Sequence, residues 1–274
     1  MTKYMSLLVK DFYNFLKTIA PLHIAEPQDN NGLQIGSLFN QVSGVLLTVD
    51  VSKEVISYAL NKGLNLIISH HPFIYKPLTN ITPDEYKGSL IYSLIKQDLN
   101  VISWHTPLDK ISDGVSEAFI KALNLKGSDF IFKEKNENFG LGRVVYLKKS
   151  IKLQDLVKKI SDLTNSWVMV VGDLETEIDS FGFCGGSGAF LKEELKKLKI
   201  NTLITSDVKY HNAQEAYEEG FNFIIIDHGV SESFVLPFLK EKLQEFLKIH
   251  NTKIPVEIFK NKSPYKIFTF KKEG

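Results

Sequence analysis

Apolar residues along this chain fall into short segments of two kinds, one with the spacing of a helix and one with the continuity of a buried strand. The segment from Ser6 to Ala20 follows the helical spacing, and Pro21 ends it. After a turn-rich stretch at 26–32, unbroken apolar runs predict buried strands at 45–49, 64–68 and 101–104.

The segments that separate these strands carry helix signals. Ser52 is placed to cap a helix that runs to Lys62, with Gly63 at its exit. A second helix is predicted over about 88–97, and a third begins at Ser112 or Asp113 and runs to about 124. This alternation of strands and helices is typical of a parallel sheet covered by helices.

A polar stretch at 126–138 interrupts the alternation, which then resumes. Beyond it we predict strands near 143–147, 167–171, 178–183, 201–205, 223–226 and 255–259, and helices near 153–163, 190–197, 212–219 and 231–247. We therefore expect an α/β fold of two interlocked domains with helix-covered sheets. The first would contain 1–126 together with about 227–274, and the second would be an insertion at about 127–226.

The net charge and the amino-acid composition limit the classes of partner and binding site that the chain can have. The chain has 274 residues and a net charge of +1, so no bulk charge attracts it to nucleic acid or to acidic membranes. No apolar run approaches the roughly 20 residues that span a bilayer, and no signal-peptide pattern is evident. Cys184 is the single cysteine, which suits a reducing cytoplasm. Because Arg143 is the single arginine, a phosphate clamp would depend on lysines and backbone amides.

Polar and ionisable residues follow five of the predicted strands at the point where each strand ends. Ligands of open α/β sheets bind just beyond the carboxyl ends of strands. One such residue alone is usually a helix cap or an ordinary surface group, and Asp50 after the first of these strands is placed to be a cap. The five strand ends carry Asp50, Ser69-His70-His71, His105, Asp207 and Asp227-His228.

Three of these junctions pair a histidine with a second possible metal ligand. His70 is followed directly by His71, and His228 is followed by Glu232 in the first turn of a predicted helix. His105 is followed by Asp109 four residues later, across a segment that Pro107 predicts to be a loop and not a helix. Imidazoles with carboxylates and no cysteine suit Zn, Mn, Fe or Ni. About six donors exceed what one open metal site needs, which favours a dinuclear hydrolytic centre. A single metal with outer-shell histidines is the alternative.

The remaining candidates carry weaker signals. His23 and His250 lie beside helix ends without acidic neighbours, so we interpret both as ordinary histidines. His211 is either a proton shuttle or substrate contact, or a residue at the start of a helix. The turn Cys184–Gly188 could hold an anion, although a tight strand-to-helix turn explains it equally well.

The strand-end motifs together resemble a known family from one end of the chain to the other. The chain is similar to the GTP cyclohydrolase I type 2 homologues, also called the Nif-three-like family. The matching stretches are Asp29–Gly36, Val49–Val51, Ser69–Ile74, His105–Asp109, Cys184–Gly186, Thr205–Ala216 and His228–Glu232. Two positions depart from the family pattern, Gln28 where an aromatic residue is usual and Asp227 where glycine is frequent, and neither removes a ligand.

The resemblance implies a specific set of roles. His70, His71, Asp109, His228 and Glu232 would bind two divalent metal ions, Zn, Fe, Mn or Ni, and His105 and His211 would line the same pocket as catalytic residues. It also implies two α/β domains and a ring-shaped homohexamer with the metal sites facing an internal cavity.

Two functions of different classes follow. The first is a metal-dependent hydrolase that acts on a nucleotide-like small molecule, as a GTP cyclohydrolase or a phosphoesterase would, with His105 or His211 transferring protons. The second is a metal-binding or regulatory scaffold that stores a metal or recruits a partner. Nucleic-acid binding has no matching motif.

Overall fold

The computed structural model describes residues 6–134 and 138–268, and these divide into two compact units. Unit 1 contains the described residues up to Val115, the piece that ends at Gly140, and Ser233–Lys260. Unit 2 contains the described residues from Ser116 to the gap, Leu141–Glu232, and the described residues from Asn261 onward. The chain passes from unit 1 to unit 2 after Val115 and, apart from the piece that ends at Gly140, is back in unit 1 only at Ser233–Lys260, whereas the predicted domains change at about 127 and 227.

Unit 1 is built on a five-stranded sheet with the order β1-β4-β3-β2-β12. Strands β4, β3, β2 and β12 run parallel, and β1 lies antiparallel to β4 at one edge. The sheet is thus parallel except at the edge strand, which has too few apolar residues to stand out in the sequence. The strands are β1 Gly32–Ile35, β2 Val45–Thr48, β3 Leu66–Ser69, β4 Asn100–Ser103 and β12 Val256–Ile258.

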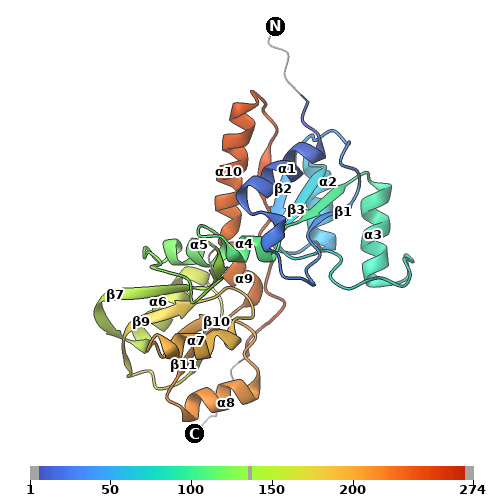
Figure 1. Ribbon diagram of the computed structural model, residues 1–274. Coiled ribbons are helices and arrows are strands. Elements are labelled where there is room, and N and C mark those ends of the chain that lie inside the picture. Colours follow the sequence, from blue (N-terminus) through green and yellow to red (C-terminus); the bar gives the residue numbers. More distant parts are fainter. Residues whose placement is uncertain (1–5, 135–137, 269–274) are drawn as a thin grey trace. The chain divides into compact units, whose positions relative to one another are not determined.

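Helices cover both faces of this sheet (Figure 1). Because side chains alternate along a strand, Val45 and Leu47 pack with α1 and α10, while Leu46 packs with α2 and α3. Ser52 caps α2 and Gly63 ends it in the left-handed conformation, as predicted. The helices of unit 1 are α1 Val9–Ile19, the 3-10 helix Leu22–Ile24, α2 Lys53–Lys62, α3 Tyr86–Lys96, α4 Thr106–Lys110 and α10 Val235–Ile249, and α5 Val115–Ala122 begins where the chain enters unit 2.

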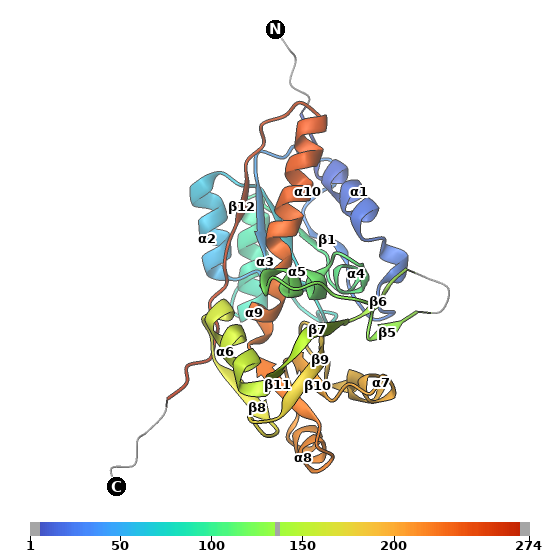
Figure 2. The same cartoon turned by 90° about the vertical axis from the view of Figure 1, so that its left-hand side faces the viewer.

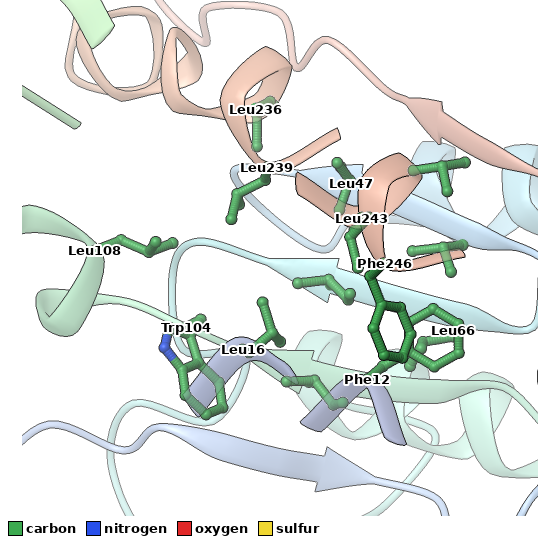
Figure 3. Close-up of a cluster of buried hydrophobic side chains, with 14 of the residues drawn as sticks. Phe12, Leu16, Leu47, Leu66, Trp104, Leu108, Leu236, Leu239, Leu243 and Phe246 are labelled. Atoms are coloured by element: carbon green, nitrogen blue, oxygen red, sulfur yellow. The ribbon is translucent and has the colours of Figure 1, made fainter. Parts of the chain in front are cut away.

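The larger apolar core of unit 1 lies between the sheet and the pair α1 and α10 (Figure 3). Phe12 of α1 packs edge-on against Phe246 of α10, with ring centroids 5.5 Å apart. Trp104, after β4, is fully buried there and its indole N–H donates to the carbonyl of Ala20 at 2.9 Å. Segments from both ends of the chain are therefore needed to close this core.

Unit 2 contains a second five-stranded sheet, with the order β7-β9-β10-β11-β8. Its three central strands β9, β10 and β11 run parallel, and the edge strands β7 and β8 are antiparallel to their neighbours. Helix α6 contacts both edge strands, and the apolar side chains of α7 and α8 pack on the central ones (Figure 2). The strands are β7 Arg143–Lys152, β8 Val168–Val171, β9 Glu177–Phe183, β10 Thr202–Thr205 and β11 Asn222–Ile226.

The remaining elements connect these strands. The helix predicted over 231–247 is two helices, α9 and α10, because Pro237 cannot donate to the carbonyl of Ser233 and its ring crowds that carbonyl. No helix within 6–134 and 138–268 has the length and apolar character needed to cross a membrane. The other elements are β5 Phe132–Lys133, β6 Gly140–Leu141, α6 Leu153–Thr164, the 3-10 helix Ala189–Leu191, α7 Lys192–Lys197, α8 Tyr210–Glu218 and α9 His228–Ser233.

Candidate metal centre

In unit 1 the parallel register brings three strand ends to the same level. Thr48 of β2 is opposite Ser69 of β3, which is opposite Ser103 of β4. The pairing continues past the strands, because the amide of His70 donates to the carbonyl of Thr48 at 3.0 Å. Residues that directly follow these strands are therefore neighbours in space, as the sequence pattern predicts.

Three histidines meet at this edge of the sheet. The ring centroid of His70 is 5.3 Å from that of His71 and 5.1 Å from that of His105. One ring nitrogen from each lies within 4.8 Å of the others, which is close enough for a shared metal ion. His70 is almost completely buried, and its Nε2 is 3.6 Å from an oxygen of Asp109. The structure thus brings His105 as near to His70 as it brings His71.

Each of the three rings is held through its Nδ1 atom. His70 Nδ1 donates to the carbonyl of Trp104 at 3.3 Å. His71 Nδ1 donates to Asp50 at 2.8 Å, and His105 Nδ1 donates to Asp29 at 2.9 Å. Carbonyl and carboxylate oxygens only accept, so the proton of each neutral ring is on Nδ1 and the lone pair is on Nε2. Metal-binding histidines are oriented in this way in proteins, so the donor set fits a divalent metal ion.

Asp29 is the most strongly bound of these supporting carboxylates. Its side chain is 3% exposed and accepts from His105, from Asn31 and from the backbone amide of Thr106. Burial raises the pKa of Asp29, but the hydrogen bonds from His105 and Thr106 outweigh it and hold the pKa well below its usual range. Burial lowers the pKa of His105, but the hydrogen bond to Asp29 and the charge of Asp109 outweigh burial and raise this pKa above 6.5.

We expect Asp29→Asn to destabilise the chelator-treated protein by about 1–3 kcal/mol, because several hydrogen bonds lose a charged acceptor. The folded-state pKa of Asp29 lies below 3.8, so its contribution is present above that pH and is lost as the pH falls through the folded value. The folded-state pKa of His105 lies above 6.5, so its contribution is present below that pH and is lost as the pH rises.

The difference in unfolding free energy between Asp29→Asn and the wild-type protein should therefore be largest between pH 3.8 and 6.5. Urea unfolding across this range measures it. A difference that is independent of pH would show that Asp29 and His105 are not coupled.

Asp109 reaches the site on a helix and not on the predicted loop. The prediction was wrong because Pro107 lies in the first turn of α4, where a missing backbone N–H costs nothing. The carboxylate of Asp109 is placed beside His70 by this turn, and the neighbouring Lys110 forms an ion pair of 2.7 Å with Glu26.

A second group of donors lies in unit 2, again at the carboxyl ends of parallel strands. His228 begins α9 directly after β11, and its Nε2 is 3.3 Å from an oxygen of Glu232, one helical turn later. Its Nδ1 donates to Asp207, which follows β10. Asp227 accepts from the amide of Val230 at the start of α9, which gives this departure from the family pattern a capping role.

The glycine-rich turn after β9 packs directly against His228 and Glu232. Gly186 has a φ of +63°, and a Cβ placed on it would lie 2.4 Å from Oε1 of Glu232. Its amide donates to the hydroxyl of Ser231 at 3.0 Å, which ties the turn to α9. In sequence this turn was equally consistent with an anion-binding loop, and the structure gives it a packing role that requires glycine.

We expect Gly186→Ala to lower the affinity of the chain for Zn²⁺ by about 10- to 100-fold, the range seen when groups that position a ligand are changed. Gly220→Ala is the matched control, since Gly220 has a similar φ of +70° and nothing within 4 Å of its added Cβ. Both variants bear the same backbone cost, so competition with a chelator isolates the displacement of Glu232. Equal affinities in the two variants would contradict this role of Gly186.

The other candidates have separate environments. His211 is exposed near the start of α8, where its ring contacts Tyr210, and its predicted role remains a prediction. His250 Nδ1 donates to the carbonyl of Phe246, and His23 packs edge-on against Phe139, in keeping with their interpretation as ordinary histidines. A cluster of three exposed glutamates on α7 and α8 is neutralised by Lys192 and Lys196, namely Glu193, Glu215 and Glu219.

Sequence reasoning missed the roles of three aspartates. Asp29, Asp50 and Asp207 each bind the Nδ1 of a histidine that follows a different strand. Asp50 was interpreted as a helix cap, but Ser52 caps α2 and Asp50 faces His71. The available signal was an acidic residue at or near a strand end beside one that carries histidine, a pattern that metal-binding histidines require.

Comparison with known proteins places these residues in a family context. The family model described as Duf34/NIF3 (NGG1p interacting factor 3) matches residues 7–264. A GTP cyclohydrolase 1 type 2 homolog of Clostridium acetobutylicum is 31% identical, covering 96% of this chain and 99% of that protein. The Helicobacter pylori protein named GTP cyclohydrolase 1 type 2 is also 31% identical, over 93% and 97% of the two chains.

Solved structures agree in fold. A hypothetical protein of Staphylococcus aureus has a TM-score of 0.90 at 28% identity, covering 96% of this chain and all of that one. A Bacillus cereus protein related to NIF3 also has a TM-score of 0.90, at 20% identity, over 96% and 99% of the two chains. The predicted α/β architecture is confirmed.

Proposed function

This chain belongs to the Duf34/NIF3 family, and from that membership we propose that it binds two divalent metal ions and hydrolyses a nucleotide-like small molecule. The proposed ligands are His70, His71 and Asp109 from unit 1 with His228 and Glu232 from unit 2. The metal is one of Zn, Fe, Mn or Ni, which imidazole and carboxylate ligands suit.

One observation carries the proposal. The three histidines proposed as ligands, His70, His71 and His228, each donate Nδ1–H to a carbonyl or carboxylate, which leaves Nε2 as the atom that would bind a metal. Bound divalent ions would supply the Lewis acidity that hydrolysis requires.

Within such a site the protein's own groups would position the substrate and move protons. His105 is held by Asp29 through Nδ1, so Nε2 is the atom from which it would transfer a proton. His211 is the second candidate for this role. Relatives named GTP cyclohydrolase 1 type 2 support a purine nucleotide or a similar compound as substrate.

Replacement of Glu232 tests the enzymatic part of the proposal. We expect Glu232→Gln to fold and to lower turnover of GTP, or of whichever nucleotide a metabolite-depletion screen identifies, by about 100-fold or more, because a charged ligand is lost. Glu218→Gln is the matched control, since Glu218 is exposed on α8 of the same unit. Unchanged turnover in Glu232→Gln would contradict the proposal.

The alternative is a metal-binding or regulatory scaffold. A dinuclear site that exchanges metal slowly, in a protein that turns over no nucleotide, would favour the scaffold over the hydrolase.

The wider proposal is a cytoplasmic homohexamer that binds a small molecule and neither a membrane nor nucleic acid. The net charge of +1 supports the absence of membrane and nucleic-acid partners, the single cysteine supports the cytoplasm, and the homohexamer rests on the family resemblance alone. Light scattering of the purified protein should give the mass of six chains, and a monomer would contradict this part.

A further inference from the structure

Unit 2 contains a cavity of about 350 Å³, and all of its lining residues except His228 lie outside the proposed ligand set. One wall comes from β8 and β11: Trp167 and Met169 are two residues apart in an extended segment, so they share a face, and Met169 is opposite Ile225. Another wall comes from residues near the end of the described chain, where Tyr265 and Ile267 are also two residues apart. Apolar and aromatic side chains therefore form most of the lining.

The end segment is held in place by specific contacts within unit 2. The Ser263 hydroxyl donates to Asp227, and the Tyr265 amide donates back to the Ser263 hydroxyl at 3.2 Å. The rings of Trp167 and Tyr265 meet edge-to-face, with centroids 6.0 Å apart and an interplanar angle of 88°. Two aromatic surfaces at right angles can contact one planar ring by its face and by its edge at the same time.

Few polar groups line the cavity, and two of them, one donor and one acceptor, could pair with a ligand. The indole Nε1–H of Trp167 is buried and has no hydrogen-bond partner within the described part of the chain. Such a donor is costly to leave unpaired, so an acceptor on a ligand would be favoured there. Asp207, also in the lining, accepts from His228 and from Ser187 with the same oxygen, Oδ2, so a ligand N–H would be paired through Oδ1.

We propose that this cavity binds the planar nitrogen heterocycle of a nucleotide-like ligand. A ring with a carbonyl or ring-nitrogen acceptor on one edge and an N–H on another would pair with Trp167 and Asp207, and its faces would lie against the aromatic and apolar walls. Lys266 in the lining supplies a positive charge for an attached anionic group. The volume suits a small ligand, since such sites measure about 300–1,000 Å³.

The inference deepens the proposed function in one respect. His228 is in the lining and is also a proposed metal ligand, so the ring would lie beside the reacting centre. That the ring is part of the substrate rests on the proposed function, whereas binding of the ring to the cavity does not.

Calorimetric titration of the purified full chain with guanosine 5′-monophosphate tests the proposal, and ribose 5-phosphate is the control probe without a ring. We expect the nucleotide to bind at least about 10-fold more tightly than the control. Trp167→Leu should weaken nucleotide binding by about 5- to 150-fold, the range that corresponds to loss of one aromatic contact with a base. Trp104→Phe, at the other tryptophan, should leave binding unchanged.

Tyr265→Ala keeps the test valid if Trp167→Leu fails to fold, because Tyr265 is 62% exposed and its replacement cannot disturb a core. It should also weaken binding. Equal binding of the two probes, or unchanged binding in Trp167→Leu or Tyr265→Ala, would overturn the proposal.

Repeating the titration after chelator treatment separates the two proposals. Nucleotide binding that survives chelation, together with no turnover by the metal-loaded protein, would support the cavity and count against the hydrolase. Turnover with two bound metals and no effect of Trp167→Leu or Tyr265→Ala would do the reverse.

Discussion

Replacing His70 by alanine should lower the affinity of the protein for Zn²⁺ by at least about 100-fold and reduce the metal content from two ions to at most one per chain. His70 is 1% exposed, and its ring is within 5.3 Å of His71 and of His105 by centroid distance. Even outer groups that orient a ligand are worth about 10–100-fold in affinity, so loss of a ligand itself should cost more. Competition with a chelator and elemental analysis measure the effect.

His250→Ala is the matched control, because His250 follows α10 directly and its Nδ1 donates to the carbonyl of Phe246 in that helix. It should keep both ions. Since His70 is buried, loss of its side chain also affects stability, so His71→Ala provides a second variant with a more exposed ring. Both ligand variants should lose metal while their unfolding transitions persist, and full metal occupancy in either would contradict the assignment of that residue.

Leu243→Ala should destabilise the protein by about 2–5 kcal/mol, the usual cost of removing a buried leucine side chain. Leu243 lies on α10, is 0% exposed, and belongs to the core that α1 and the sheet of unit 1 share (Figure 3). Because Leu141–Glu232 of unit 2 separate α10 from α1 in the sequence, the variant tests whether this distant helix completes the core of unit 1. Urea-induced unfolding followed by the fluorescence of Trp104 in the same core reports the change.

Ile249→Ala on the same helix is the control for this variant. Ile249 is 78% exposed, so its replacement should change the unfolding free energy by no more than about 0.5 kcal/mol. A similar loss in both variants would show that burial of the Leu243 side chain is not responsible, and no loss in Leu243→Ala would contradict the discontinuous core.

Much of the fold could be predicted because buried parallel strands have unbroken runs of apolar residues in the sequence. The strands that precede His70 and His105 were located in this way, and their common register then required the residues after them to be neighbours. Edge strands were harder. β1 has four residues and two of them are only partly buried, so its pattern is too short to separate from the turn before it.

Helix prediction was wrong at two prolines, because proline is compatible with the first turn of a helix but interrupts a helix further along. Pro107 was expected to prevent a helix, yet proline is favoured in a first turn, and α4 forms around it. Pro237 acts in the opposite sense and divides a helix predicted to be continuous into α9 and α10. The difference is position within the helix, and sequence spacing alone did not give that position.

The supporting half of the candidate site could not be predicted because it depends on contacts distant in sequence. Asp29 is 76 positions from His105, and Asp207 is 21 positions from His228. Nothing in the spacing of either pair indicates a hydrogen bond. The same holds for Gly186, whose need for glycine arises from Glu232 on another element.

The most direct test of the proposed metal centre is the metal content of the wild-type protein. Elemental analysis of the purified chain, before and after incubation with Zn²⁺, Fe²⁺, Mn²⁺ or Ni²⁺ and removal of free metal, gives the number of ions per chain. We predict two divalent ions per chain, removable by a chelator and restored on addition of metal. A chain that retains no ion under any of these conditions would contradict the account.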